Sequence, residues 1–465
     1  MKQGYSTGGI PMKPLIEEVT TELDAFDIYS LLSEDETVTF LDSSLTAYPI
    51  GRYSIIGLNP FTAFKFEDNT CYIDGIRVEG NPLDVLKKLV TSYSIENETD
   101  LPYVAGAMGF FSYDFGRTLE NIPSTAADEV KVPDCFFYFY DNAVVVDNYE
   151  KRTYVTALGV LSEKEKSLKS LQDAISGGIR KAIEKPLLCP VDFTSNLSRE
   201  EYVEKVEMVR AYIKSGDVYI TNLTQRFKCE TNKSPYDVYR ELRRINPAPF
   251  SAIMHFEGFS IVSSSPERFL SVRNRIVETR PIKGTRPRGK NKAEDDLNRQ
   301  ELLDSEKDKS ELIMIVDLER NDLSRVCRKN TLKVTELFKL EEYSTVFHLV
   351  STVTGELKEG YSAIDCIRAC FPGGSITGAP KVRSMEVIEE LEPTRRNIYT
   401  GCLGYLGFDG NADFNIIIRT ILMKDGSAYF GVGGGITWES EKHAEYEESL
   451  DKARALMSAL KGDRL

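Results

Sequence analysis

The alternation of apolar and polar residues divides the chain into two stretches of different character. Between residues 12 and 185, short apolar runs bounded by turn residues predict a series of strands. The clearest of these runs lie at 37–41, 53–58, 105–113, 136–140 and 143–146. A polar stretch at 162–185, rich in Lys, Glu and Ser, is typical of an exposed helix, and the segment 187–190 predicts a boundary after it.

The second stretch begins with a strong helix signal. Ser198 and Glu201 have the spacing of a capping box, apolar residues recur on one face through Ile213, and Gly216 can end the helix. Because strands and helices then mix without strict alternation, the pattern predicts an α+β fold. The charged segment 286–297 is expected to be a solvated loop. Strands are predicted at 218–223, 251–255, 260–263, 276–279 and 414–423, and helices at 305–320, 363–370, 381–391 and 441–460.

Composition and charge narrow the function. The 465 residues include 58 Lys and Arg against 72 Asp and Glu, a formal net charge of −14. A general binder of nucleic acid or anionic membrane needs excess positive charge, so neither partner is expected. No run approaches the roughly 18 apolar residues of a membrane span, and the first residues lack a signal-peptide core. The eight cysteines, without a C-x-x-C pair, are expected to be reduced core thiols in a cytoplasmic protein.

Two glycine-rich segments are candidate anion cradles. The segment 373–381 begins like a phosphate loop, but Ala379 occupies the place of the required lysine. The segment 431–435 lacks the helix that follows a dinucleotide fingerprint. Glycine lets backbone N–H groups approach a carboxylate closely, although each segment taken alone is more typical of a tight turn.

Paired carboxylates form the next candidate. Asp308 and Glu311 are three residues apart on a predicted helix, and Glu445 and Glu448 repeat the spacing on the last helix. Each pair therefore shares a helix face. Such carboxylates could hold a divalent cation, although solvated acidic faces are the simpler interpretation of the spacing alone.

Single side chains with candidate chemistry follow two predicted strands. Lys283, among cationic neighbours, could act as a nucleophile, and Glu267 could act as a general acid. A surface lysine and an ion-paired glutamate are the alternatives. His348 lies in an apolar stretch, which is more typical of an interior histidine than of a catalyst.

Together these segments resemble the chorismate-using enzymes, the family of anthranilate, aminodeoxychorismate, isochorismate and salicylate synthases. The likeness covers nearly the whole chain from about Met12. It implies a large compound β-sandwich flanked by helices, with a first region at 12–187 and a chorismate-binding catalytic region at 190–462. The motifs that carry it, in family order, are SSSPERF, RPIKGTRPRG, IMIVDLERNDL, FHLVSTVTG, FPGGSITGAPK, YTGCLGY, FNIIIRT and VGGGITWES.

The resemblance also implies a ligand set. Glu311 and Glu448 would hold Mg²⁺, with Glu445 acting through water and Asp308 nearby. The metal would bind the ring carboxylate of chorismate, which is a dianion. The residues that would line the chorismate site are Thr279, His348, Thr377, Tyr399, Arg419, Gly434 and Gly435.

Within the family, the segment PIKGT is the sharpest discriminator. The aminodeoxychorismate branch is similar to this chain in carrying Lys at position 283, where anthranilate synthases typically have Ala. Lys283 as nucleophile and Glu267 as general acid would then aminate chorismate at C4. Water-adding members carry a base lysine in the strand matching 218–223, and this chain has none there. Ile220 is a departure, because aminating relatives commonly have Gln at that place.

The resemblance implies partners as well. The sequence has no Cys-His-Glu glutaminase segment, so a separate glutamine amidotransferase subunit is expected to supply ammonia for p-aminobenzoate and folate biosynthesis. Two alternatives stay open: an anthranilate synthase component I and a non-catalytic chorismate-binding protein. The segments 40–44 and 246–250 resemble the tryptophan-binding region of relatives. The candidate tryptophan site consists of Ser43, Asn246, Pro247 and Phe250.

Overall fold

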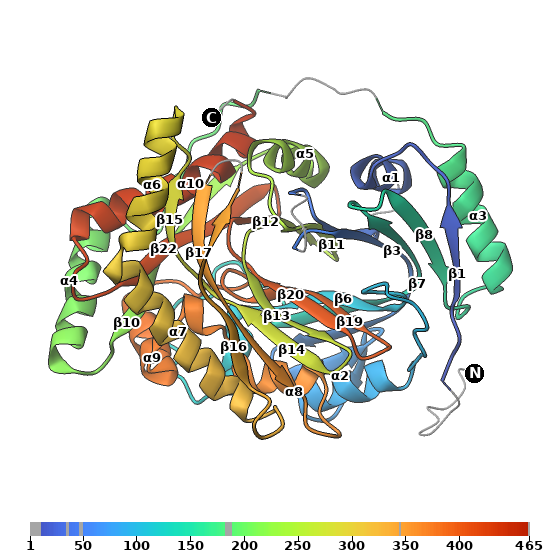
Figure 1. Cartoon of the computed structure of the whole chain (residues 1–465), viewed down its shortest axis with the longest axis horizontal. Helices are drawn as coiled ribbons and strands as arrows, with labels where there is room; N and C mark the ends of the chain where they lie inside the picture. The colour runs from blue at the N-terminus through green and yellow to red at the C-terminus, as the bar shows by residue number, and fades with distance from the viewer. Residues whose placement is uncertain (1–10, 34–36, 46–49, 182–187, 344–345, 464–465) are drawn as a thin grey trace.

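Strands occupy the middle of the molecule and helices cover its outside (Figure 1). The computed structural model describes residues 11–33, 37–45, 50–181, 188–343 and 346–463, and every candidate site residue lies within these ranges. The mixture of helices with a large antiparallel sheet confirms the predicted α+β fold.

Two arms of sheet extend from one long ladder, formed by β3 (Tyr53–Glu67) and β7 (Cys135–Asp147). All the pairings between strands in both arms are antiparallel. The first arm runs in the order β1 (Leu15–Val19), β8 (Arg152–Ala157), β7, β3, β2 (Thr39–Asp42), β11 (Phe250–Phe256), β12 (Phe259–Ser265), β21 (Thr420–Lys424), β22 (Ser427–Ile436) and β10 (Ile220–Glu230).

The second arm leaves β7 in the other direction. Strands from both predicted regions pair in each arm, β2 with β11 in the first and β6 with β19 in the second. The predicted boundary lies beside residues 182–187, outside the described residues. The second arm runs in the order β7, β6 (Gly106–Phe111), β19 (Cys402–Gly407), β20 (Ala412–Ile416), β13 (Arg268–Arg273), β14 (Ile276–Arg280) and β17 (Val346–Glu356), with β15 (Ile282–Pro287) and β16 (Lys333–Glu342) beside β17.

Short strands and helices complete the fold. The predicted capping box is confirmed, because Ser198 and Glu201 exchange hydrogen bonds with each other's backbone, and Gly216 ends the helix with a φ of 85°. The short strands are β4 (Thr70–Ile73), β5 (Ile76–Val78), β9 (Thr194–Ser195) and β18 (Gly378–Ala379). The helices are α1 (Ala25–Leu32), α2 (Pro82–Thr91), η1 (Tyr113–Thr118), α3 (Lys164–Ser176), α4 (Arg199–Ser215), α5 (Pro235–Ile245), α6 (Lys292–Asp304), α7 (Glu306–Ser324), α8 (Ala363–Cys370), η2 (Gly374–Ile376), α9 (Lys381–Leu391) and α10 (Lys442–Lys461).

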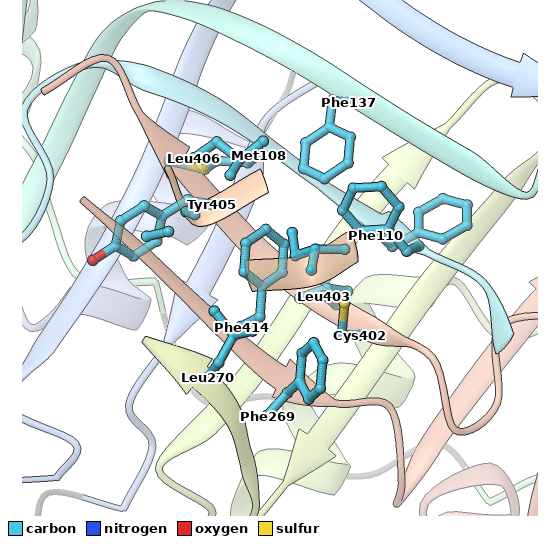
Figure 2. Close-up of a cluster of buried hydrophobic side chains, with 14 of the residues drawn as sticks. Met108, Phe110, Phe137, Phe269, Leu270, Cys402, Leu403, Tyr405, Leu406 and Phe414 are labelled. Carbon is cyan, nitrogen blue, oxygen red and sulfur yellow. The ribbon is translucent and has the colours of Figure 1, made fainter. Parts of the chain in front are cut away.

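The main hydrophobic core joins the two arms. Figure 2 shows aromatic and aliphatic side chains of β6, β7, β13, β19 and β20 meeting in one cluster. Phe110 of the second arm packs against Phe256 of the first, with ring centroids 5.0 Å apart. Removal of such apolar area from water is the main favourable contribution to folding. All eight cysteines are free and seven are buried. None of the described helices is long and apolar enough to cross a membrane.

Two predictions of local structure are wrong. Most of the charged segment 286–297 is not a loop: α6 begins at Lys292, capped by Asn291, and Leu302 anchors the helix in the core. The predicted strand 414–423 is two strands, because the chain turns at Arg419, where φ is 52°. There the chain leaves β20 in the second arm and enters β21 in the first.

Candidate active site

Glu267 lies where the chain crosses from the first arm to the second, between β12 and β13. Its carbonyl accepts a hydrogen bond from the backbone N–H of Ile416 at 3.0 Å, which fixes the turn. The side chain is buried. Burial raises the pKa of the Glu267 carboxyl, although a hydrogen bond from Ser375 and the charge of Lys283 oppose the rise. A buried carboxyl that tends to keep its proton is suited to general-acid chemistry.

Lys283 lies on β15, at a register shift that Gly284 allows with a φ of 78°. Its Nζ donates a hydrogen bond to the Ser375 carbonyl at 3.1 Å. A side chain at position 284 would collide with Asp308, since a Cβ there would lie 2.8 Å from the Asp308 Cγ. The described residues include no ion-pair partner for Lys283, so its amine is not committed to a carboxylate.

The predicted metal ligands come from two helices. Glu311 projects from α7, and Glu445 and Glu448 project from α10 toward Gly434 on β22. A Cβ placed on Gly434 would lie 3.2 Å from Oε2 of Glu445 and 3.8 Å from Oε1 of Glu448. Asp308, one helical turn before Glu311, contributes to the raised pKa of Glu311 and also forms an ion pair with Arg286 at 3.2 Å. The structure therefore brings Glu445 and Glu448 together beside β22, and Glu311 of α7 lies close enough to Glu448 for their charges to interact.

The charges of these carboxylates repel one another. Burial raises the pKa of Glu311, and Glu448 adds to the rise while Lys283 and Lys307 oppose it. Burial also raises the pKa of Glu445, again with a contribution from Glu448. Burial would raise the pKa of Glu448 too, but Lys452, 2.8 Å away, and other lysines lower it overall.

These residues fit a Mg²⁺ ion held mainly by water. Within the described ranges, no three acidic, histidine or cysteine side chains form a ready ligand group. Mg²⁺ does not need one, because it usually keeps several waters and takes one or two protein carboxylates. Glu311 and Glu448 raise one another's electrostatic energy across the site, and a divalent cation between them would relieve that repulsion.

Arg419 and Tyr399 are neighbouring cationic and polar side chains of the candidate site. The Arg419 guanidinium donates to the Lys452 carbonyl at 3.1 Å and has no ion-pair partner among the described residues. Burial lowers its pKa, and the Tyr399 hydroxyl and Glu448 partly compensate. Gly431 makes room for the Tyr399 ring, since a Cβ there would lie 2.3 Å from its Cδ1. A half-buried arginine without a carboxylate partner is suited to an anionic ligand.

Three further predicted residues surround these groups. His348 on β17 lies 2.9 Å, through Nδ1, from the Thr285 hydroxyl. Burial lowers its pKa to about 4, with a contribution from Arg419, so the imidazole is neutral at pH 7. Thr377 donates to the Gly373 carbonyl at 2.8 Å and thereby closes the glycine-rich turn. Gly435 packs against Ile220, whose Cδ1 would lie 3.0 Å from a Cβ at that position.

Residue-by-residue reasoning on the sequence missed Ser375, Lys452 and Glu319. The Ser375 carbonyl also accepts from Asn222 Nδ2 at 3.1 Å, so this one group holds both Asn222 and Lys283. Lys452 bridges Glu448 and the Gly433 carbonyl, at 2.8 Å to each. Lys452 is four residues after Glu448, so helical spacing alone indicates that the two side chains lie on one face of the helix. Glu319 is eight residues after Glu311, and the same spacing places it on the face that carries Glu311.

The candidate tryptophan residues divide into two groups. Ser43 and Phe250 line a cavity of about 580 Å³ between the two arms. Asn246 does not line this cavity. Its side-chain amide instead donates a hydrogen bond to the Ser264 hydroxyl at 3.1 Å. Pro247, beside it, does not line the cavity either.

Strand β14 separates this cavity from the catalytic residues. Side chains of a strand alternate between its two faces. Glu278 and Arg280 line the cavity, whereas Thr279 between them bonds to Glu319 on α7, which also carries Glu311. The two sites therefore lie on opposite faces of one strand.

Known proteins are similar to this chain in sequence and in fold. The chain matches the chorismate binding enzyme family over residues 39–458. It is 40% identical to aminodeoxychorismate synthase component 1 of Bacillus subtilis, over 88% of this chain and 89% of that protein. It is 38% identical to anthranilate synthase component 1 of Acetivibrio thermocellus, over 96% of this chain and 95% of that protein. A crystal structure of anthranilate synthase component I from Streptococcus pneumoniae superposes with a TM-score of 0.80 at 34% identity, covering 89% of this chain and 93% of that one.

The relatives in sequence are divided between two names, and the solved anthranilate synthase component I has the fold described above. The family match extends from β2 to α10 and so includes every predicted catalytic and metal-binding residue. This chain belongs to the chorismate binding enzyme family and is a chorismate-utilising enzyme of the anthranilate and aminodeoxychorismate synthase component 1 type.

Proposed function

We propose that this protein is the synthase component of an aminodeoxychorismate synthase. It would aminate chorismate at C4, with ammonia from a glutamine amidotransferase partner, and give 4-amino-4-deoxychorismate for p-aminobenzoate and folate biosynthesis. The observation that carries this proposal is the convergence of Lys283 and Glu267 on Ser375. An amine without an ion-pair partner and a carboxyl that tends to keep its proton are the two groups that a covalent amination needs.

In the first displacement, the Lys283 amine attacks C2 of the chorismate ring. The new C–N bond forms as the ring double bond shifts and the 4-hydroxyl leaves. Glu267 donates its proton to that hydroxyl, which departs as water. Such proton donation typically accelerates a step by about 10²–10⁴-fold. The burial that raises the pKa of Glu267 supports this role.

In the second displacement, ammonia adds at C4 and the double bond shifts back. The C2–N bond to Lys283 breaks, and the lysine amine is regenerated. Glu267, now a carboxylate, accepts a proton from the adding ammonia, so protons balance over the cycle. Two allylic displacements replace one difficult substitution, which is the usual advantage of covalent catalysis.

The remaining residues would orient the dianionic substrate. Arg419 and Tyr399 would bind the enolpyruvyl carboxylate, with the backbone of Gly434 and Gly435 beside them. Bound between Glu311 and Glu448, Mg²⁺ would draw electron density from the ring carboxylate and make the ring more electrophilic. Local cations of this kind would allow an anionic substrate to bind to a chain with a net charge of −14.

Two alternatives make different predictions. An anthranilate synthase would use the same substrate and metal but eliminate pyruvate, and it would have no use for an amine at position 283. A non-catalytic chorismate-binding protein would not need the acid and the amine together. The names of the relatives leave both synthase activities open.

Product analysis separates these functions. Purified protein is incubated with chorismate, Mg²⁺ and excess ammonium salt, and the products are resolved by liquid chromatography and mass spectrometry. A species with the mass of aminodeoxychorismate, converted to p-aminobenzoate by an added lyase, supports the proposal. Formation of anthranilate would assign the chain to the other branch, and binding of chorismate without turnover would favour the non-catalytic alternative.

A further inference from the structure

A second carboxyl, that of Glu319, lies beside the predicted general acid. It projects from α7 and interacts electrostatically with Glu267, Asp322 and Lys381. Gly374 of the neighbouring turn covers its stem, since a Cβ at Gly374 would lie 3.8 Å from the Cγ of Glu319. The mechanism proposed above assigns this carboxyl no part.

Hydrogen bonding determines its protonation state. The Thr279 Oγ1 lies 2.8 Å from the Phe269 carbonyl and 2.9 Å from Oε2 of Glu319. A threonine hydroxyl has one hydrogen, and a carbonyl can only accept. If Thr279 donates to Phe269, Glu319 must supply the hydrogen of the second bond, and so must be protonated.

The bulge in β13 fixes the direction of these bonds. The register between β13 and β14 shifts between Arg268 and Ser271, so Phe269 has no paired residue on β14. The pairing with β20 shifts at the same place. The Thr279 hydroxyl therefore satisfies a buried backbone carbonyl that the ladder leaves without a partner, and such carbonyls are rarely left unpaired.

Neighbouring charges agree with a neutral Glu319. The nearest cation, Lys381, pairs with Asp322 at 2.5 Å and donates to the Cys370 carbonyl at 2.6 Å. In the part of the chain that is described, Glu319 has no ion-pair partner. Burial raises its pKa to about 8, and Glu267 and Asp322 add to the rise while the charge of Lys381 opposes it. The Cys370 thiol is the other titratable group that interacts with this carboxyl.

We propose that Glu319 is a positioning residue, held as the neutral carboxylic acid, whose hydrogen bond to Thr279 keeps β14 in place and whose neutrality keeps a second negative charge away from Glu267. Its ionisation would withdraw the Thr279 hydroxyl from Phe269 and would repel the dianionic substrate. The kinetic part of this inference rests on the proposed function, whereas the protonation state does not. We expect kcat/KM for chorismate to fall on the alkaline side as Glu319 ionises.

The variant Glu319→Gln tests the kinetic part, because an amide can donate to Thr279 but cannot ionise. Near pH 7 we expect the kcat/KM of Glu319→Gln to lie within about threefold of the wild-type value. Between pH 7 and pH 9, the kcat/KM of the variant divided by that of the wild type should rise about tenfold. Ammonia protonation affects both proteins equally and cancels in the ratio. Asp317→Asn, an exposed position on the same helix, should keep the wild-type profile. A ratio for Glu319→Gln that does not change with pH would overturn the positioning role.

Infrared difference spectroscopy tests the protonation state without any substrate. The wild-type minus Glu319→Gln spectrum should contain a protonated carboxylic C=O band at pH 7 that disappears with a midpoint near pH 8. Absence of this band at pH 7 would refute the inference whatever reaction the enzyme catalyses. If the band is present but chorismate yields no aminated product, the proposed function fails while the assignment of a neutral Glu319 stands.

Discussion

The Lys283 amine and the Glu267 carboxyl reach the same residue, Ser375, from different parts of the sheet. Lys283 donates to the Ser375 carbonyl at 3.1 Å, while Glu267 accepts a hydrogen bond from the Ser375 side chain. Ser375 lies in the short helix η2, whose turn Thr377 closes. The glycine-rich segment that resembles a phosphate loop thus positions an amine and an acid relative to each other.

Removal of the Lys283 amine should stop covalent amination. We expect Lys283→Ala to lower the rate of aminodeoxychorismate formation by about 10²-fold or more, because the first displacement loses its nucleophile. Steady-state assays with ammonium salt measure the change, and Lys292→Ala, at an exposed position on α6, is the matched control. Intact-protein mass spectrometry with chorismate and no ammonia should detect an adduct in wild type that is missing from Lys283→Ala. Full activity in Lys283→Ala would exclude the nucleophilic role.

Neutralisation of Glu448 should weaken Mg²⁺ binding. We expect Glu448→Gln to raise the Mg²⁺ concentration needed for half-maximal turnover by about tenfold or more, since even groups behind the ligands typically contribute that much to metal affinity. Isothermal titration with Mg²⁺ provides a readout that does not depend on turnover. Glu447→Gln changes the preceding residue, which is exposed and paired with Arg199, and should behave as wild type. An unchanged Mg²⁺ affinity in Glu448→Gln would contradict its role as a ligand.

His348 should make the fold sensitive to acid. Its pKa falls from an ordinary value of 6.5 to about 4 in the folded protein, chiefly through burial. Between these two values the unfolded chain binds the additional proton, so stability falls as the pH falls from about 6.5 to about 4. The loss is about 1.4 kcal/mol per pH unit within that window.

The variant His348→Asn lacks this titration. Urea unfolding at several pH values should therefore show the stability difference between wild type and His348→Asn shrinking as the pH is lowered through the window. His443→Asn, exposed on α10, is the matched control. A difference that stays constant from pH 7 to pH 4 would mean that His348 titrates normally in the folded protein.

The cavity between the arms should bind tryptophan. At a free tryptophan concentration one hundred times the Kd, we expect binding to raise the free energy of unfolding by about 2.7 kcal/mol. A higher Tm measures this stabilisation. Phe250→Ala should reduce this shift, because Phe250 lines the cavity whereas the catalytic residues lie on the other face of β14. Chorismate should still raise the Tm of Phe250→Ala. If tryptophan leaves the Tm of wild type unchanged at every concentration, the assignment of this cavity is wrong.

The sequence predicted helices better than it predicted the breaks between strands. The helix from 363 to 370 agrees with α8 residue for residue, and the capping box at Ser198 marked the start of α4 correctly. The apolar pattern predicts Arg419 inside a strand, because the apolar run around it continues through the turn. Such a turn depends on the chain crossing from one sheet arm to the other, and local periodicity contains no information about that crossing.

The family and the types of residue in the site can be predicted from the sequence, because eight motifs in one order are a property of the chain alone. Tertiary structure decided how those residues meet. Strands far apart in sequence bring Glu267, Lys283 and the glycine-rich turn together, and α10 brings Glu445 and Glu448 to β22. It also decided that Glu319 has no ion-pair partner among the described residues and shares the Thr279 hydroxyl with the Phe269 carbonyl at the bulge. Burial and hydrogen-bond partners set the protonation of a carboxyl, and both arise only when distant segments pack.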